Sequence, residues 1–553
     1  MQRRLKLILF VFLFALLWLP FFQEQTKYFK EPILKGAFIK PVKPNFSIDS
    51  LNELKFQKQF EDYENYNFGF RGLMVKIRNS LNYILFKELS CIDNIAGKSN
   101  FIFSVGSTER TLGIRYNSKE QNNSTIEKIN FLKEGLESHG GKLICLLVPS
   151  KETIYPDFLP APYRGNYKSQ TDYADFIEGY KKYNISVIDY CEYFKQLKNT
   201  TRYPLYTTTG VHWSLYGASV AQDTLVNYIE KIVGKAIPKY KRDGVELSDT
   251  ARESDNDFEA PLNLLFGLGQ PQYIYPKLQM IESTRKNYRP KVIIIGDSFF
   301  WQIKNHRMLM NIFTEDSKFW YYFAMNSCPI GDAAGCPLKD INIMKELETA
   351  DIVLLISNIS TLDRFPFGVT DYYYNNVAPP EILESVCQNI KGSSAWMANL
   401  NNKTSTTNLS IDEKVTAEAK RICRNKKNFT LKAANDKYIC AGGAEDKILF
   451  ANRDAGSDWE TFSALFLEND KVAIYSYKNK FLSSELSNKA EIVSNKIGID
   501  TWEMFTIIRL DNDFVAFKAS NGKYFSLDEK SLQIFATGSY IGKNEKFKLT
   551  NIK

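Results

Sequence analysis

Two residues of this 553-residue sequence lie in surroundings that suit nucleophilic chemistry, a serine and a histidine. Ser298 follows the apolar run "KVIIIGD", so we expect it at the end of a buried strand, where the chain turns into a helix. Of the three histidines, only His212 lies among small and hydroxyl residues beside a large aromatic, in "YTTTGVHWSLYGA". A hydroxyl with an imidazole base in reach performs acyl transfer through a covalent intermediate. The alternative is that Ser298 is an ordinary turn residue and His212 a hydrogen-bonded structural one.

The elements that must position these residues alternate between apolar strands and helices from about residue 98 to 360. The runs "KLICLLVPS", "KVIIIGDS" and "DIVLLISN" are continuously apolar, and helical segments separate them. This pattern predicts an α/β domain with a parallel sheet covered on both faces. Sites in such sheets lie beyond the carboxyl ends of the strands. We therefore expect Asn358, at the end of "DIVLLIS", to face the same site as Ser298.

The N-terminus combines positive charge with an apolar run. Arg3, Arg4 and Lys6 precede an uninterrupted apolar stretch over residues 7–22, which is typical of a secretion signal or a membrane anchor. No Ala-x-Ala-type cleavage site follows, which favours an uncleaved single-pass anchor over residues 1–26. The positive charge predicts that the N-terminus is cytoplasmic and that the bulk of the chain is extracytoplasmic. The Lys- and Pro-rich segment over residues 27–54 is expected to form an extended stalk.

Composition excludes some classes of function. The net charge of +8 is spread along the chain without a dense basic block, which argues against nucleic-acid binding. The eight cysteines include no C-x-x-C pair and do not cluster with histidines, so we predict no metal site, and no cofactor is indicated. Cys328 and Cys336 flank a Gly-rich loop, and a disulfide between them and two free thiols are both open.

The last part of the chain contains an internal repeat. The dipeptides Lys437-Tyr438, Lys480-Phe481 and Lys523-Tyr524 are each 43 positions apart, and "DWETF" at 458–462 recurs as "TWEMF" at 501–505. Three copies of an all-β unit are too few for a propeller and predict a β-trefoil over residues 428–553. The Trp and Phe of each repeat are expected in its core.

These repeats resemble fascin-like β-trefoil domains in "TLKAANDKY", "ANRD" and the "WE-x-F" pattern. The resemblance implies a module that binds carbohydrate or protein partners, or a structural appendage. A fold alone does not identify a ligand.

A second resemblance concerns residues 55 to 425. "HWS-x-YGA" upstream and "GDSF" downstream, with "NYNFGFR" and "LVPSKETIYPDFLP", resemble the alginate O-acetyltransferase family. The resemblance implies an SGNH-hydrolase-like domain over residues 55–427. It also implies membrane-linked, extracytoplasmic enzymes that acetylate an exopolysaccharide, often with a membrane-bound O-acyltransferase as the source of acetyl groups.

The same resemblance assigns roles to residues. Ser298 becomes the nucleophile and His212 the base, and the backbone N–H of Ser298, with Asn358, is expected to stabilise the oxyanion. Weaker candidates for the oxyanion or substrate site follow from the shared motifs: Asp297, which we also expect to hold the turn, Lys151, Tyr155 and Arg71.

One position departs from the family pattern. The family has an Asp two residues before the histidine, and this chain has Gly210 there. The missing acid would orient the imidazole and stabilise its charged form. A backbone carbonyl, Asp255 or Asp257 could substitute, a Ser-His dyad could suffice, or the chain could be inactive. We expect Gly210→Asp to retain or raise the turnover of an active enzyme.

Three hypotheses follow. The first is an anchored exopolysaccharide O-acetyltransferase with an attached sugar-binding trefoil. The second is a carbohydrate esterase of the same fold, because water and sugar acceptors use the same Ser-His pair. The third is a catalytically impaired polysaccharide-binding or assembly protein. The polymer, the acetyl donor and the oligomeric state do not follow from the sequence.

Overall fold

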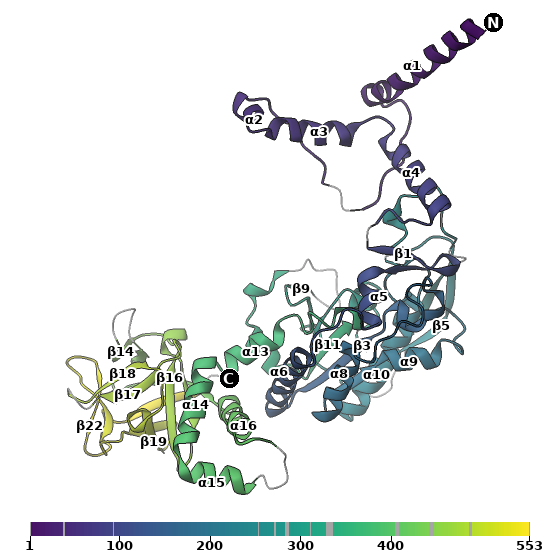
Figure 1. Ribbon diagram of the computed structural model, residues 1–553. Helices are drawn as coiled ribbons and strands as arrows, with labels where there is room; N and C mark the ends of the chain where they lie inside the picture. Colours follow the sequence, from purple (N-terminus) through teal and green to yellow (C-terminus); the bar gives the residue numbers. More distant parts are fainter. Residues whose placement is uncertain are drawn as a thin grey trace. The chain divides into compact units, whose positions relative to one another are not determined.

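The computed structural model describes residues 2–36, 39–91, 93–252, 254–269, 272–281, 287–309, 311–327, 336–403, 409–441, 447–485 and 489–551. The chain divides into two compact units, Met1–Gly368 and Val369–Lys553 (Figure 1). Cys328 and the side chain of Cys336 lie outside the described residues, so the expected disulfide stays a prediction. The boundaries expected from sequence also stay predictions, although contacts group residues 369–427 with the second unit.

A seven-stranded sheet forms the centre of the first unit, in the order β10-β9-β8-β7-β11-β3-β4. Its middle strands β7 (Val292–Gly296), β11 (Ile352–Asn358) and β3 (Lys142–Val148) are parallel to one another. Almost every residue of these three strands is buried, as their apolar runs predict. The other strands are β4 (Ser186–Asp189), β8 (Lys318–Tyr321), β9 (Met325–Ser327) and β10 (Cys336–Pro337).

Helices cover both faces of this sheet, which confirms the predicted α/β layers. On one face, Ile144, Ile294 and Leu354 share a core with α9 (Tyr190–Leu197), α10 (Leu215–Val233) and α11 (Phe299–Asn305). The other face is covered by α6 (Lys119–Ser138) and α8 (Asp172–Lys182). Other elements of this domain include β1 (Asn94–Ala96), β2 (Ile102–Ser104), α5 (Val105–Thr111), α7 (Lys151–Ile154), β5 (Tyr240–Ser248), β6 (Tyr273–Met280), α12 (Ile343–Glu348) and η5 (Ile359–Thr361).

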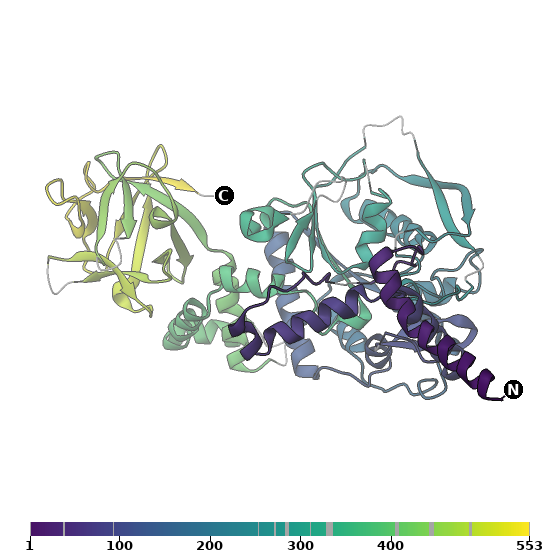
Figure 2. The ribbon, with the colours of Figure 1, turned by 90° about the horizontal axis from the view of Figure 1, so that it is seen from above.

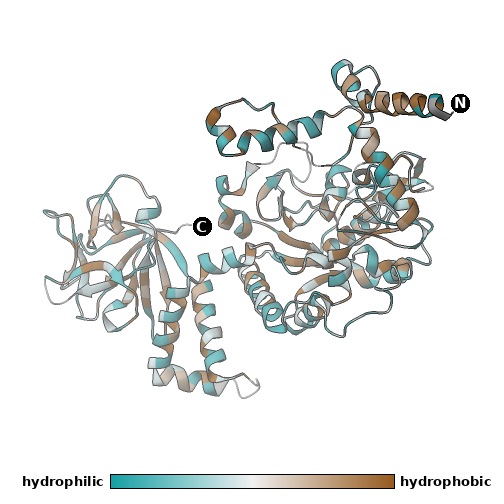
Figure 3. Cartoon of the chain, turned by 45° about the horizontal axis from the view of Figure 1, so that its top comes forward, coloured by the Kyte–Doolittle hydropathy of each residue, from teal (hydrophilic) through white to brown (hydrophobic). Residues whose placement is uncertain are grey.

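Four helices precede the domain: α1 (Gln2–Thr26), α2 (Ile48–Asn52), α3 (Lys55–Asn67) and α4 (Arg71–Phe86). Residues 4–26 of α1 are long and apolar enough to cross a membrane, by length and composition. Figure 3 shows α1 as a mainly brown, hydrophobic helix. The described part of the expected stalk, residues 27–54, is mostly without regular structure apart from α2.

The second unit begins with four helices: α13 (Val369–Val377), α14 (Pro380–Gly392), α15 (Ser394–Lys403) and α16 (Ile411–Arg424). The strands that follow pair into a closed barrel, β12-β15-β16-β19-β20-β23 and back to β12 (Figure 2). Their bounds are Lys427–Lys432, Phe462–Phe466, Lys471–Ser476, Met504–Arg509, Phe514–Lys518 and Phe547–Asn551.

Three further strand pairs extend from the barrel at corresponding places in the repeats. They are β13–β14 (Tyr438–Ala441, Leu449–Arg453), β17–β18 (Phe481–Glu485, Glu491–Lys496) and β21–β22 (Tyr524–Leu527, Ile534–Gly538). The internal repeat therefore corresponds to a repeated all-β structure, as predicted.

The phenylalanines of the repeats lie in the core as expected, and the tryptophans do not. Phe462, Phe505 and Phe547 are buried in the barrel core, as expected. Trp459 and Trp502 are 43% and 42% exposed, so their expected core position is wrong. The acid after each Trp is buried instead and accepts hydrogen bonds at the start of the short turn that carries it, for example Glu460 from Ser457. This cap turns the tryptophan outward.

Candidate active site

Ser298 and His212 meet at the carboxyl ends of the parallel strands. His212 Nε2 lies 2.9 Å from Ser298 Oγ, and His212 Nδ1 lies 2.8 Å from Asp257 Oδ2. A carboxylate on Nδ1 leaves Nε2 free of its proton, so that Nε2 can accept the proton of the serine hydroxyl. The three side chains have the geometry of a Ser-His-Asp triad.

The turn after β7 positions Ser298. Gly296 ends the strand, and an added Cβ there would overlap Cγ2 of Ile356 on β11. Asp297 is buried, and its carboxylate accepts hydrogen bonds from the backbone N–H of Phe299 (3.0 Å) and of Asn358 (2.6 Å). Burial raises the pKa of Asp297. Asp297 thus ties the serine turn to the end of β11, in keeping with the expectation that it holds the turn.

His212 is held by the residues on either side of it. The next residue, Trp213, is fully buried against Tyr190 and donates from Nε1 to the carbonyl of Phe299 at 3.1 Å. The His212 ring itself packs on the ring of Phe299, with centroids 4.8 Å apart. The indole therefore connects the histidine segment directly to the helix that begins after Ser298.

Asp257 supplies the acid, from 45 positions after the histidine. One carboxylate oxygen contacts His212 Nδ1, and the other accepts the backbone N–H of Val211 at 2.6 Å. The carboxylate thus fixes both the imidazole and the backbone before it. Asp257 was one of several alternatives from sequence, and the spacing alone did not distinguish it from Asp255.

Gly210 is required by the loop that carries this acid. An added Cβ at Gly210 would lie 2.5 Å from Thr207 Oγ1 and 2.8 Å from the backbone oxygen of Asp255. An aspartate there would require the backbone of the Asp255 segment to move, which argues against the expectation that Gly210→Asp retains or raises turnover. That expectation stays a prediction. Asp255 itself is buried, and burial raises its pKa to about 7.

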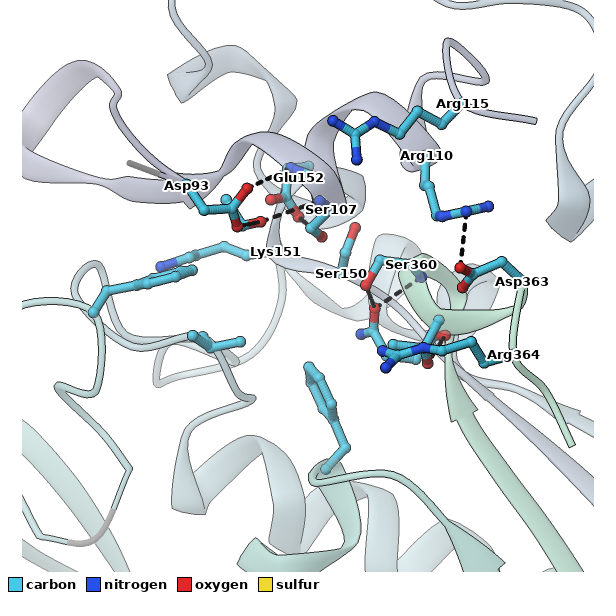
Figure 4. Close-up of a pocket in the computed structure, with 17 residues that line it drawn as sticks. Asp93, Ser107, Arg110, Arg115, Ser150, Lys151, Glu152, Ser360, Asp363 and Arg364 are labelled. Carbon is cyan, nitrogen blue, oxygen red and sulfur yellow. Dashed lines mark hydrogen bonds and ion pairs between the residues drawn. The ribbon is translucent and has the colours of Figure 1, made fainter. Parts of the chain in front are cut away.

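A cavity of about 390 Å³ adjoins the triad (Figure 4). Its lining includes Val211 and Phe299, the chain neighbours of His212 and Ser298. Charged side chains converge on it from α5 and from the segment after β11. Arg110 donates to Asp172 (3.1 Å) and to Asp363 (2.8 Å), and Figure 4 shows this second pair at one side of the cavity.

Arg115 and Arg364 bring further positive charge to the cavity, opposite the side where Asp93 and Glu152 lie. The sequence interpretation missed six charged residues of this lining: Asp93, Arg110, Arg115, Glu152, Asp363 and Arg364. The strand-end rule could not have found them through "NFIFSV", because β2 pairs antiparallel with β1 and is not a strand of the central parallel sheet.

Asn358 lines the same cavity, but its side chain already makes hydrogen bonds to the protein. Its Nδ2 donates to the carbonyl of Pro149 at 2.8 Å, and its Oδ1 accepts the backbone N–H of Ser360 at 2.9 Å. It therefore caps the short helix η5. The oxyanion role expected for Asn358 stays a prediction.

Lys151 is buried beside the triad loop. Its Nζ donates to the backbone carbonyls of Thr207 (3.2 Å), Thr208 (2.9 Å) and Gly210. Burial lowers the pKa of Lys151 to about 7. The three carbonyl acceptors favour the charged form, because only an ammonium has three N–H groups to donate. Lys151 thus organises the segment before His212.

The two other weak candidates lie away from the cavity lining in the described part of the chain. Tyr155 packs in an aromatic cluster, with its ring 5.4 Å from that of Phe101 and 6.5 Å from that of Tyr206. The guanidinium of Arg71, at the start of α4, lies 5.6 Å from the ring of Tyr66. The structure therefore does not bring Tyr155 or Arg71 together with Ser298.

Comparisons with known proteins agree with this geometry over part of the chain. Residues 96–299 match the family described as "SGNH hydrolase-like domain, acetyltransferase AlgX". Residues 426–532 match a domain family of unknown function. No curated protein matches the chain.

Solved structures similar to parts of the chain include the O-acetyltransferase domain of Pseudomonas putida AlgJ, with 17% identity over 51% of this chain and 99% of that one and a TM-score of 0.34. The designed three-fold symmetric protein ThreeFoil has 14% identity over 23% of this chain and 99% of its own, with a TM-score of 0.21. The BEL β-trefoil has 14% identity over 23% and 93%, with a TM-score of 0.21.

Proposed function

We propose that this chain, whose first unit carries an SGNH-hydrolase-like domain of the AlgX acetyltransferase type, is a membrane-anchored O-acetyltransferase. It would transfer acetyl groups to hydroxyls of an exopolysaccharide outside the cytoplasm. The observation that carries the proposal is the continuous hydrogen-bond chain from Ser298 through His212 to Asp257, at 2.9 and 2.8 Å.

The proposed reaction has two steps. In the first, His212 Nε2 takes the proton of Ser298 Oγ as this oxygen attacks the acetyl carbonyl, and the proton then passes to the departing group of the donor. In the second, a sugar hydroxyl gives its proton to His212 and attacks the acetyl-serine, and Ser298 recovers a proton as it leaves. Asp257 stabilises the imidazolium in both steps. The backbone N–H of Ser298, with Asn358, is our candidate for the oxyanion hole.

The location in this proposal depends on α1. Its apolar residues 4–26 would cross the membrane, with the basic residues before them on the cytoplasmic side. A membrane-bound O-acyltransferase is the partner that we propose as the source of acetyl groups. Arg364 at the cavity favours a substrate with exposed oxygen acceptors, whereas Arg110 is already paired with Asp172 and Asp363.

The barrel of the second unit is, in this proposal, a sugar-binding β-trefoil. The support is the closed barrel with three repeated strand pairs, and the stacked pair of the exposed Trp459 and the half-buried Tyr477. The rings of Trp459 and Tyr477 lie nearly parallel, at 9°, with centroids 5.8 Å apart. Exposed aromatic faces suit stacking against the apolar faces of sugar rings.

An acetyl-transfer assay tests the enzymatic proposal. The full chain in vesicles is given a small activated acetyl ester and an exopolysaccharide oligosaccharide, and acetate release and oligosaccharide acetylation are both measured. We expect acetylated oligosaccharide, an acetyl adduct on Ser298 by mass spectrometry, and loss of most turnover in Ser298→Ala and His212→Ala. His139→Ala, at the exposed end of α6, is the matched control and should leave turnover unchanged.

The outcomes separate the hypotheses. Release of acetate without transfer supports the esterase, which uses water in place of the sugar. Absence of turnover with unchanged polymer binding in Ser298→Ala supports a binding or assembly protein. Full turnover in Ser298→Ala contradicts both enzymatic hypotheses.

Trp459→Ala tests the sugar-binding part of the proposal. We expect weaker binding of the polymer, by isothermal titration, with only a small change in the melting temperature, because Trp459 lies outside the barrel core and is 43% exposed. Phe462→Ala is the comparison, since Phe462 lies in the barrel core, and its loss should cost about 3–5 kcal/mol of stability. Equal polymer affinity in Trp459→Ala and the unaltered chain would contradict the role of this surface.

A further inference from the structure

Helix α4 presents an unusual face to solvent. The residues that it buries are Gly72, Ser80 and Tyr83. Its large apolar side chains are exposed instead, with exposed fractions from 37% to 67%: Leu73, Met74, Ile77, Leu81, Ile84, Leu85 and Phe86. A helix on the surface of a water-soluble domain normally turns its apolar stripe toward the core. The orientation of α4 is the reverse of this.

The exposed apolar residues form one continuous stripe. At 3.6 residues per turn, all of them except Phe86 fall within about a third of the helix circumference. We call this stripe the α4 apolar face. Leu265 and Phe266, in the loop that α4 contacts, are also exposed and add to the apolar surface beside it.

Hydrogen bonds on the opposite side of α4 fix this orientation. Asn79 Nδ2 donates to the carbonyl of Leu262 at 2.8 Å, and Ser80 Oγ accepts the backbone N–H of Leu265 at 2.9 Å. Tyr83 is buried, and its hydroxyl donates to Asn100 Oδ1 at 3.2 Å. Because polar groups hold α4 on the domain, the outward direction of its apolar face is a specified feature of the fold.

The start of α4 lies against the end of α1. The carboxylate of Glu31 accepts the backbone N–H of Phe70 at 2.8 Å and of Gly72 at 3.3 Å. Gly69 has no room for a side chain, because an added Cβ would overlap the carbonyl oxygen of Pro20 in α1. If α1 crosses a bilayer, its C-terminal end lies at the bilayer surface, and the α4 apolar face begins at the same depth. Figure 1 shows the two helices meeting at this point and running in different directions.

The charges of α4 match a lipid surface. The helix contains Arg71, Lys76 and Arg78 and no acidic residue, and Lys87 follows it. Interfacial helices combine an apolar face with basic residues that extend their charged ends toward lipid headgroups. Juxtamembrane basic residues also gain favourable energy near anionic lipids.

We infer that α4 is an interfacial membrane helix, with its apolar face immersed at the headgroup–acyl boundary of the bilayer that α1 crosses. The inference rests on the proposed anchoring by α1. Helix α4 then holds the domain of the first unit against the membrane. The sequence predicts instead that an extended stalk over residues 27–54 separates the domain from the anchor. This brings the proposed active-site domain close to the membrane, where a membrane-bound acetyl donor is found.

Spin-label accessibility in the full chain tests the inference. The chain is reconstituted in vesicles of phosphatidylethanolamine and phosphatidylglycerol, with a nitroxide attached at Leu81→Cys, Leu247→Cys or Leu13→Cys, and the chain without an added cysteine gives the background. Leu247 on β5 is the matched control, since it is 52% exposed and Leu81 is 51% exposed. Label collisions with oxygen, which concentrates in lipid, and with a water-soluble nickel chelate are then compared.

We expect a several-fold higher oxygen-to-nickel ratio at residue 81 than at residue 247, with residue 13 also in lipid. If the label at 13 lies in lipid and that at 81 has the ratio of 247, the inference is overturned and the anchoring stands. A label at 81 with low collision rates for both reagents is covered by protein, which also overturns it. If the label at 13 is in water, the anchoring itself is contradicted, and the inference falls with it.

Discussion

Asp257 contacts both the imidazole of His212 and the backbone N–H of Val211. This double contact shows how a chain with Gly210 two positions before its histidine can still place a carboxylate on the imidazole. The acid comes from a different segment, and the glycine leaves room for that segment. The glycine at position 210 and the carboxylate that comes from a later loop therefore belong to one arrangement.

The first prediction concerns Asp257→Asn. The amide can no longer hold Nδ1–H of His212 as a carboxylate does, so we expect the turnover number to fall on the order of 10³- to 10⁴-fold. The melting temperature should change little, because Asp257 is partly exposed. Acetyl transfer and thermal unfolding provide the measurements, with Asp249→Asn, on an exposed loop, as the control. Full activity in Asp257→Asn with loss in Asp255→Asn would assign the role to Asp255.

The second prediction concerns the pH dependence of stability. Burial raises the pKa of Asp255 from 3.8 to about 7, so between these pH values the folded chain holds a proton that the unfolded chain has lost. The free energy of unfolding therefore falls as pH rises through this window, by up to about 4 kcal/mol from this residue.

Urea unfolding of the unaltered chain and of Asp255→Asn at several pH values between 4 and 8 measures this effect. We expect the Asp255→Asn variant to become more stable relative to the unaltered chain as pH rises. A difference independent of pH would show that Asp255 is ionised in the folded chain throughout this range.

At the scale of elements, three segments meet around Lys151. Its ammonium binds carbonyls of the segment before His212, and its Nζ lies 5.2 Å from the ring of Phe258, which directly follows Asp257. The start of α7 therefore supports both the histidine segment and the acid loop. The sequence indicated Lys151 through a shared motif, but its position under these loops is a property of the fold.

The third prediction tests the close contact between these loops. In Gly210→Ala the added Cβ meets the backbone oxygen of Asp255, and backbone cannot move aside as a flexible side chain does. We expect a loss of about 1–3 kcal/mol in stability, measured by urea unfolding, and a lower turnover number. Gly392→Ala is the control, since an added Cβ there meets nothing within 4 Å. Equal stability of the two variants would contradict the tight contact at Gly210.

Elements with strong local patterns were predictable from sequence, and contacts between loops were not. The uninterrupted apolar runs that form β3, β7 and β11 predict buried parallel strands, and the 43-residue spacing predicts the repeated β-structure. Ser298 followed from its position after a buried strand, His212 followed from its hydroxyl and aromatic neighbours, and a shared motif supported both. Asp257 could not be distinguished from Asp255, because two residues of spacing in an irregular loop carry no periodic signal.

The tryptophans of the repeats show a second limit. Apolar type alone placed Trp459 and Trp502 in the core, but the neighbouring acids occupy buried capping positions. The sequence carries a signal for this contact, because Ser457 and Asp500 each precede an acid by three positions, which is the capping-box pattern. Apolar type alone, without this pattern, placed the tryptophans wrongly.

At the scale of the whole molecule, the two compact units have separate hydrophobic cores. In the second unit, helix α14 is joined to the barrel by hydrogen bonds. Asn389 Nδ2 donates to the carbonyl of Ile499 at 3.3 Å, and Asn479 Nδ2 donates to Glu381 Oε1 at 3.0 Å. Ser385 Oγ also donates to the carbonyl of Ile497. These contacts make the helices part of the barrel unit.

The fourth prediction follows from this grouping. A chain of residues 369–553 should unfold cooperatively at a higher temperature than a chain of residues 428–553, by roughly 5 °C or more, because the shorter chain loses the contacts of α14. Circular dichroism during heating measures the difference. Equal melting temperatures would favour the boundary at residues 427 and 428 that the sequence predicts.

The position of Asp257 also has a consequence for how such proteins are recognised. A pattern search that requires an aspartate two positions before the histidine would classify this chain as lacking the acid, although a carboxylate contacts the imidazole from a loop 45 positions further on. Chains with glycine at that position should therefore be examined for an aspartate or glutamate in a later loop that can contact the histidine.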